Sequence, residues 1–146
     1  MTAIAVAEHL VAAPLPQVFA QFIDFSRWDL WMPSVFAPVS GPARSLKRGD
    51  TFKVGIGRLH LPLELEVIRV RPDKEICWRG GTALVLQAEH SFLFSEAGAE
   101  TRVRSEEPLS GLLSRGPAGA ALERVFSDGA RVLLERFAAY VLRYNH

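Results

Sequence analysis

The chain has 146 residues, of which 49% are hydrophobic and 23% charged, a composition that indicates one globular domain and excludes an intrinsically disordered chain. The formal net charge of +1 gives no reason to expect nucleic acid as a partner. No apolar run approaches the roughly 20 residues of a transmembrane helix, so we expect no stable membrane insertion. The single cysteine, Cys77, cannot form an internal disulfide, which favours a cytoplasmic location.

The first part of the chain predicts a strand followed by two short helices. The strand covers residues 3–12 and ends at the prolines of 13–16, which favour the first turn of a helix. A short amphipathic helix follows over 18–23, and a second helical turn covers 25–31. That turn stops before Pro33, because a residue that precedes proline avoids the helical region. The larger apolar residues on one side of the strand are Ile4, Val6 and Leu10.

The middle of the chain consists of short apolar runs separated by glycine, proline and polar residues. This pattern is typical of antiparallel strands joined by hairpins. The predicted strands cover residues 35–39, 51–57, 61–70, 75–80, 84–95 and 101–107. In the third of these runs the alternation breaks near Ile68, so we expect a β-bulge there. The alternation is clearest in the fifth run, where one face carries Leu86, Ala88, His90, Phe92 and Phe94.

Residues 117–144 predict one long helix, because apolar residues recur there every three or four positions. These residues are Leu122, Val125, Phe126, Gly129, Leu133, Phe137, Tyr140 and Tyr144. A helix of about 28 residues spans roughly 42 Å, and its apolar face needs a broad cover. We therefore predict the α+β helix-grip fold. In this fold a seven-stranded curved antiparallel sheet surrounds a long C-terminal helix, with two short helices between strands 1 and 2.

Several motifs, taken in order, resemble the SRPBCC superfamily. This superfamily includes START lipid-transfer domains, birch-pollen-allergen-like proteins and polyketide cyclase/dehydrase-like proteins. Residues 13–19 resemble the opening of the family's first helix, and residues 25–35 resemble its tryptophan–x–proline turn. The remaining matches cover 72–80, 90–92 and 101–113. Met32 departs from the pattern, because many relatives carry asparagine there. We therefore expect one SRPBCC-like domain over residues 1–146.

The resemblance implies a cavity between sheet and helix that holds a hydrophobic small molecule such as a lipid, a quinone or an aromatic polyketide. A curved sheet also fits a straight helix poorly, and the gap is either filled by side chains or left as a pocket of about 300–1,000 Å³. The residues expected to contact a ligand are Trp31, Phe52, Val54, Ile56, Leu63, Leu65, Trp78, Leu86, His90, Phe92, Val103, Phe126, Leu133 and Phe137. The alternative is that these residues form an ordinary core.

Two polar residues share the inward face of the predicted strands. A buried His90 needs a hydrogen-bond partner, because an unpaired imidazole costs about 2 kcal/mol or more. Glu107 shares its face with Val103 and Ser105 in the neighbouring strand. The two side chains could orient a ligand or carry out acid–base chemistry. The alternative is a structural histidine and a glutamate that binds backbone or solvent.

Three functions remain open from the sequence. The first is binding, and possible transport or sequestration, of a hydrophobic molecule. The second is a polyketide cyclase, aromatase or dehydratase that uses His90 and Glu107. The third is a protein-interaction module with a filled cavity. Because few polar residues lie on the inward face, we favour binding. The histidines lack the spacing of metal ligands, so we expect no metal and no cofactor, and both a monomer and a homodimer are compatible with the chain.

Overall fold

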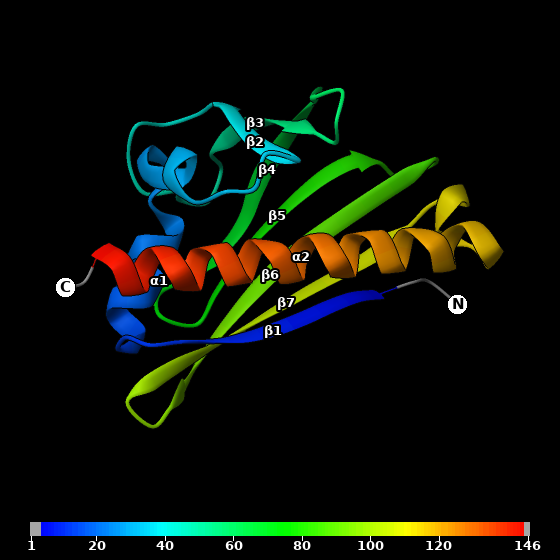
Figure 1. Cartoon of the computed structure of the whole chain (residues 1–146). Coiled ribbons are helices and arrows are strands. Elements are labelled where there is room, and N and C mark those ends of the chain that lie inside the picture. Colours follow the sequence, from blue (N-terminus) through cyan, green and yellow to red (C-terminus); the bar gives the residue numbers. More distant parts are fainter. Residues whose placement is uncertain (1–3, 145–146) are drawn as a thin grey trace.

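The chain forms one curved antiparallel sheet that wraps around a long C-terminal helix (Figure 1). The structure is a computed structural model that describes residues 4–144. The strands are β1 (Ile4–Val11), β2 (Phe36–Ser40), β3 (Thr51–Ile56), β4 (Leu61–Arg71), β5 (Glu75–Thr82), β6 (Leu86–Ala97) and β7 (Glu100–Ser110). They lie in the order β1-β7-β6-β5-β4-β3-β2. The helix-grip prediction is therefore confirmed.

The boundaries differ from the prediction at a few places. Strand β7 continues to Ser110 instead of ending at Glu107, and it stays paired with β6 there. Strand β6 begins at Leu86 instead of Leu84, because residues 83–85 form the turn from β5. The predicted bulge is present as a register shift between Val67 and Arg69. Ala3, which the prediction placed in the first strand, lies outside the described residues.

The apolar side of β1 that the sequence singled out faces solvent. Ile4, Val6 and Leu10 are 48%, 37% and 46% exposed, whereas Ala5 and Val11 are fully buried. Helix α2 (Gly116–Tyr144) lies directly beside this strand, and the Val6 amide donates to Ser127 Oγ at 3.3 Å. This close approach leaves room mainly for small side chains on the inner face of β1.

Two short helices follow β1, as predicted. Helix α1 (Leu15–Ile23) carries a proline in its first turn, where a missing N–H removes no helical hydrogen bond. It ends at Ile23. The carboxylate of the next residue, Asp24, accepts a hydrogen bond from the Ser26 amide and so caps the 3₁₀ helix η1 (Phe25–Leu30). The Trp28 indole donates to the Phe22 carbonyl at 2.9 Å, which fixes the two helices against each other.

The aromatic side chains of α1 and η1 fill one end of the space between sheet and helix. Phe22 lies at the centre, with ring centroids 4.6 Å from Phe92 and 5.0 Å from Phe137. We call this region the packed end. Its residues are Phe19, Phe22, Phe25, Trp28, Trp31, Phe52, Phe92, Phe94 and Phe137, all of which are buried. Arg136 donates to the Trp31 carbonyl at 2.8 Å and joins α2 to this end.

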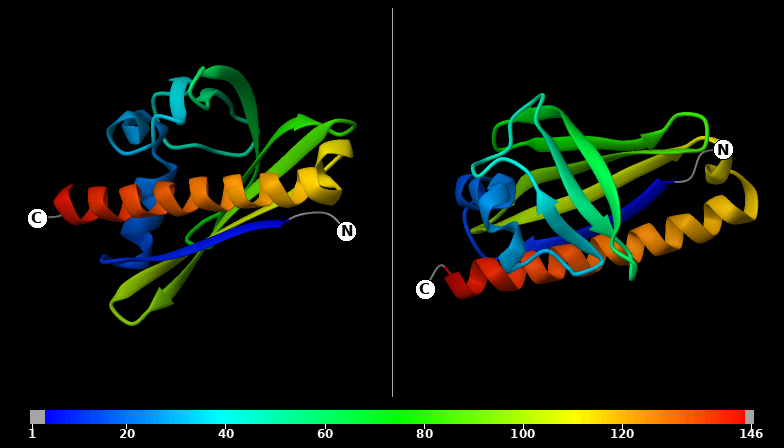
Figure 2. Two further views of the ribbon diagram at one scale, coloured as in Figure 1. Left: turned by 45° about the vertical axis from the view of Figure 1, so that its right-hand side comes forward. Right: turned by 90° about the horizontal axis from the view of Figure 1, so that it is seen from above.

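Helix α2 crosses the concave side of the sheet, after the short 3₁₀ helix η2 (Leu112–Ser114) (Figure 2). Its face is buried unevenly. The C-terminal half buries Ala130, Leu133, Leu134, Phe137, Tyr140 and Val141. In the N-terminal half Phe126 and Gly129 are half-buried, and Val125 is 63% exposed. None of the described helices is long and apolar enough to cross a membrane.

Candidate functional site

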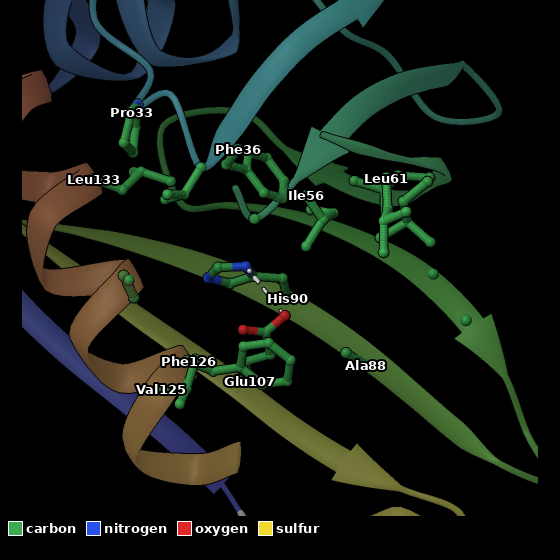
Figure 3. Close-up of a pocket in the computed structure, with 18 of the residues that line it drawn as sticks. Pro33, Phe36, Ile56, Leu61, Ala88, His90, Glu107, Val125, Phe126 and Leu133 are labelled. Carbon is green, nitrogen blue, oxygen red and sulfur yellow. Dashed lines mark ion pairs between the residues drawn. The ribbon is translucent and has the colours of Figure 1, made fainter. Parts of the chain in front are cut away.

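A cavity of about 570 Å³ lies between the N-terminal half of α2 and the sheet, away from the packed end (Figure 3). We call this region the hollow end. It opens to solvent, because Leu61 and Val125 in its wall are 60% and 63% exposed. Its walls are Pro33, Val35, Phe36, Ile56, Gly57, Arg58, Leu61, Pro62, Leu63, Leu65, Trp78, Gly80, Gly81, Leu86, Ala88, His90, Glu107, Val125, Phe126, Gly129, Ala130 and Leu133.

Eight of the fourteen predicted contact residues line this cavity, and Glu107 does so as well. The eight are Ile56, Leu63, Leu65, Trp78, Leu86, His90, Phe126 and Leu133. The other six are buried away from the cavity wall, and they are Trp31, Phe52, Val54, Phe92, Val103 and Phe137. All six lie in the continuous hydrophobic core. Contact between any of these residues and a ligand stays a prediction.

The prediction missed wall residues of two kinds. Leu61 and Ala88 share the inward face of their strands with residues that were chosen, so alternation alone could have found them. Arg58 and Pro33 lie in a turn and in a loop, where no periodicity marks an inward position. The segment before β2 and the β3–β4 turn reach the wall because of the fold, which local sequence does not reveal.

Gly129 marks the place where the cavity reaches the helix backbone. A Cβ atom built at this position would meet no heavy atom within 4 Å. Gly129 lies one turn from both Phe126 and Leu133, which also line the cavity. A larger side chain at this position would therefore enter the cavity without a clash at its first atom. This makes Gly129 a natural position for a cavity-filling substitution.

The floor of the cavity carries a chain of three polar groups on β6 and β7. His90 Nε2 lies 2.6 Å from Ser105 Oγ, and His90 Nδ1 lies 3.4 Å from Glu107 Oε2. Figure 3 shows His90 and Glu107 beside each other, with Phe126 on the helix side and Ile56 and Leu61 on the hairpin side. The predicted pair is thus brought together. Ser105, its third member, was noted only as sharing the face of Glu107.

Burial controls the charges of this pair. Removal from water disfavours an imidazolium, and it lowers the pKa of His90 to about 3. The same loss of hydration disfavours a carboxylate, and it raises the pKa of Glu107 to about 7. Near neutral pH the His90 imidazole is therefore uncharged, and Glu107 is present both as the neutral acid and as the carboxylate. The 3.4 Å contact between His90 Nδ1 and Glu107 Oε2 is therefore a polar contact with a neutral imidazole and not a salt bridge.

Ionisation of Glu107 is coupled to the tautomer of His90. When Glu107 is a carboxylate, the Nδ1–H of His90 can donate to it, and Nε2 accepts from the Ser105 hydroxyl. When Glu107 is protonated, it can donate to Nδ1, and Nε2–H then donates to Ser105 Oγ. A serine hydroxyl serves both arrangements, since it donates and accepts. In both arrangements the protons of the chain are shared among its own members, so the free oxygen lone pairs of Glu107 face the cavity as acceptors. Protonated Glu107 becomes a donor to a molecule in the cavity when its hydroxyl turns from His90 to that molecule.

The same three residue types form the catalytic triad of many hydrolases, but this arrangement differs in one respect. Ser105 is fully buried and does not line the cavity. A nucleophile must reach the bound substrate, and this hydroxyl is covered by its own neighbours. We conclude that Ser105 holds the His90 ring in place, while Glu107 and the other face of His90 meet the cavity.

Other reactive groups give no second centre in the described part of the chain. Residues 4–144 contain no cluster of three or more His, Cys, Asp or Glu side chains that could hold a metal ion. Cys77 is fully buried on the opposite face of β5 from Trp78, and burial raises the pKa of its thiol. A neutral, covered thiol is a poor nucleophile. The cavity itself contains Arg58, His90 and Glu107 as its ionisable wall residues.

Solved structures resemble this fold over its whole length at low sequence identity. MLL2253 from Mesorhizobium loti is 16% identical with a TM-score of 0.74, and the match covers 97% of this chain and 98% of that one. CalU16 from Micromonospora echinospora is 14% identical with a TM-score of 0.69, over 97% and 83%. DynU16, a protein in the dynemicin biosynthetic locus, is 18% identical with a TM-score of 0.72, over 99% of this chain and 49% of that one.

No curated protein matches the sequence. A family model does match, over residues 2–142, and its description is polyketide cyclase / dehydrase and lipid transport. This match agrees with the SRPBCC-like motifs in the sequence, with the seven-stranded curved sheet and with the cavity under its C-terminal helix. The chain is therefore a member of the polyketide cyclase / dehydrase and lipid transport family.

Proposed function

We propose that this protein binds a hydrophobic small molecule in the cavity of the hollow end. The observation that carries the proposal is the cavity itself, with about 570 Å³ of space and mainly apolar walls. This volume lies within the range of ligand pockets, about 300–1,000 Å³. A core of this size normally closes such a gap with side chains, because empty apolar volume forfeits packing energy.

The wall also limits what kind of molecule fits. Its inner polar side chains are His90 and Glu107, with Ser105 behind His90, and Arg58 lies on the β3–β4 turn. A ligand with a charged inner end would have no partner of fixed charge there. The ligand we propose is therefore a lipid, a quinone or an aromatic polyketide with one carbonyl or hydroxyl oxygen within reach of Glu107. Transport or sequestration of such a molecule needs no further chemistry from the protein.

A second function, cyclisation or dehydration of a polyketide-like substrate, is favoured by the same polar chain. A general acid–base group works best when its pKa lies near the working pH. The pKa of Glu107, about 7, meets that condition. In this alternative Glu107 would transfer a proton to or from a substrate carbonyl, with His90 holding the carboxyl. The family description names both cyclases and lipid transport, so it supports both alternatives.

The third possibility, a protein-interaction module with a filled cavity, required aromatic side chains to close the gap. Phe137 lies in the packed end, and Trp78 and Phe126 line the space without filling it. An open cavity of about 570 Å³ therefore disfavours a module whose cavity is filled.

The binding proposal can be tested with N-phenyl-1-naphthylamine, a neutral apolar probe that fluoresces in apolar surroundings. We expect saturable binding by the native chain and a loss of at least about tenfold in affinity for Gly129→Leu, which places a side chain inside the cavity. The matched control is Ala139→Leu, an exposed position on the same helix, which should bind like the native chain. Equal binding by the native chain and Gly129→Leu would contradict the proposal.

Glu107→Gln separates the two functions. This change keeps the shape and a hydrogen-bonding oxygen but removes the exchangeable proton. If the protein only binds, affinity for an apolar ligand changes by a few-fold and stays independent of pH around neutrality. If it is an enzyme, turnover of a poly-β-ketone substrate by the native chain falls by about 10²–10⁴-fold in the variant, the usual share of an acid–base group.

A further inference from the structure

The turns of the sheet differ in composition between its two ends. In an antiparallel sheet, the β3–β4 turn, the β5–β6 turn and the segment after β7 lie at the same end. Each exposes a leucine at its tip. Leu59 is 83% exposed, Leu84 is 74% exposed and Leu112 is 63% exposed. Single exposed leucines are common on protein surfaces, but one at each of three turns at the same end of the sheet is a pattern.

The opposite end of the sheet has polar turns. The β4–β5 turn is Arg71-Pro72-Asp73-Lys74, and the β6–β7 turn lies between Glu96 and Glu100. No large hydrophobic side chain is exposed in either of these turns, all of whose residues are described. Hairpin turns of one sheet, exposed to the same solvent, thus have opposite chemistry. Turn formation requires no leucine, so the apolar tips need another explanation.

Backbone contacts hold two of the apolar tips together. The Leu112 amide donates to the Leu84 carbonyl at 3.0 Å, and the Leu113 amide donates to the Val85 carbonyl at 2.9 Å. Gly111 has a φ of 99°, and a Cβ there would lie 2.6 Å from the Val85 carbonyl oxygen. Figure 2 shows η2 and the end of the β5–β6 hairpin at the same end of the molecule. Leu84 and Leu112 therefore lie on backbone segments that are hydrogen-bonded to each other.

The β3–β4 and β5–β6 turns border the cavity, and the β3–β4 turn and the segment after β7 each carry an arginine. Gly57, Arg58 and Leu61 of the β3–β4 turn line the cavity, as do residues on both sides of the β5–β6 turn. The three segments, residues 57–61, 82–86 and 111–116, contain Arg58 and Arg115 but no aspartate or glutamate. An apolar surface with basic and no acidic groups complements the surface of an anionic bilayer.

We propose that the apolar tips, defined as residues 57–61, 82–86 and 111–116, dock this protein on an anionic lipid bilayer with the cavity mouth against the membrane. Leu59, Leu84 and Leu112 enter the region between headgroups and acyl chains, and Arg58 and Arg115 contact anionic headgroups. This contact is peripheral and reversible, since the buried apolar area is small. An apolar molecule could then pass between bilayer and cavity without crossing water. The docking goes beyond ligand binding and does not require that the ligand be known.

The test is co-sedimentation of the full chain with vesicles of phosphatidylcholine, or of phosphatidylcholine in which a third of the lipid is phosphatidylglycerol. We expect binding to the anionic vesicles and a loss of at least about tenfold in the partition coefficient for Leu59→Ser/Leu84→Ser. Arg58→Gln/Arg115→Gln should remove most of the preference for phosphatidylglycerol, because each cation contributes about fivefold. The matched control is Leu10→Ser/Leu142→Ser, two exposed side chains outside the tips, which should bind like the native chain.

The proposal is overturned if the native chain stays in the supernatant with both vesicles, or if the control loses as much binding as the tip variant. It is also overturned if light scattering shows a dimer that Leu59→Ser/Leu84→Ser converts to a monomer without any vesicle binding, because the tips would then contact a second copy. The tip variant should still bind N-phenyl-1-naphthylamine in its cavity. That readout separates failure of docking from failure of ligand binding.

Discussion

The packed end and the hollow end are built from the same sheet and the same helix, yet one is filled and the other is open. At the packed end, Phe22 of α1, Trp28 of η1 and Trp31, the residue after η1, lie between the two layers, and these side chains are almost fully buried. At the hollow end no segment is inserted, and the helix faces the sheet with Gly129 and the half-buried Phe126. The comparison indicates that the two halves of helix α2 have different roles. Its C-terminal half stabilises the fold, and its N-terminal half leaves room for a ligand.

The largest contrast should come from removing one phenylalanine at each end. Phe22→Ala removes the ring at the centre of the aromatic cluster, and we expect it to lower the free energy of unfolding by about 3–5 kcal/mol. Phe126→Ala removes a ring that already faces open space, so we expect a loss of about 1 kcal/mol. Urea unfolding of both variants gives the comparison. Equal losses would mean that the two ends are packed alike.

Larger side chains should be tolerated at the hollow end and should destabilise the packed end. Val18→Phe places a larger side chain in a fully buried position near the packed end, and overpacking should cost about 1–3 kcal/mol. Gly129→Leu removes a helical glycine and fills open space, so the free energy of unfolding should rise by up to about 1 kcal/mol. Thermal unfolding of ligand-free protein measures both. A strongly destabilised Gly129→Leu variant would show that the hollow end has no room for the side chain.

The pH dependence of stability tests the polar chain of the hollow end. The folded-state pKa of Glu107, about 7, lies above the unfolded value of 4.5, so its contribution to stability falls as pH rises between these values. The folded-state pKa of His90, about 3, lies below the unfolded value of 6.5, so its contribution rises with pH over that range. The two contributions oppose each other between pH 4.5 and 6.5.

Glu107→Gln should remove the falling contribution and keep the rising one. The free energy of unfolding of this variant should therefore increase from pH 4.5 to 6.5, relative to the native chain, by up to about 1.4 kcal/mol per pH unit. Urea unfolding at a series of pH values gives the two curves. Parallel curves would show that Glu107 has an ordinary pKa and that the site is wetter than we describe.

The smallest expected effect distinguishes two tryptophans of the packed end. The Trp28 indole donates to the Phe22 carbonyl, whereas the buried Trp31 Nε1 has no hydrogen-bond partner within residues 4–144. Replacing either tryptophan by phenylalanine makes the ring smaller, but only Trp28→Phe also removes a hydrogen bond that the structure shows. We expect Trp28→Phe to be the more destabilising by about 1 kcal/mol. The opposite order in thermal unfolding would point to an undetected partner of Trp31.

The sequence predicts the fold well because each element is specified locally. Hairpin turns separate the strands, prolines begin and end the short helices, and one long periodic segment forms α2. The sequence predicts the cavity wall less well, because alternation tells which face a residue occupies but not how far along the strand it lies. Phe92 and His90 share one face of β6, yet Phe92 packs against Phe22 and His90 faces the cavity.

The side chains of another segment decide which part of an inward face stays open. Phe52 and Val54 in β3 have the correct alternation for a ligand contact, but Phe25 and Trp28 of η1 pack on the Phe52 ring at 5.4 Å and 5.2 Å. Ile56, further along the same strand, lines the cavity. His90 and Glu107 could be picked out together because both positions carry a polar residue on an apolar face; the structure brings them within 3.4 Å, and their role stays a prediction. That signal is independent of the position along the strand.

The central claim is that the hollow end holds an apolar molecule, and native mass spectrometry of protein purified without stripping tests it most directly. The native chain should carry a non-covalent adduct that organic extraction releases, and Gly129→Leu, prepared in parallel from the same host, should lack it. Ala139→Leu should keep it. An adduct of the same mass and occupancy on Gly129→Leu would contradict the account, because a molecule bound there would not occupy the cavity.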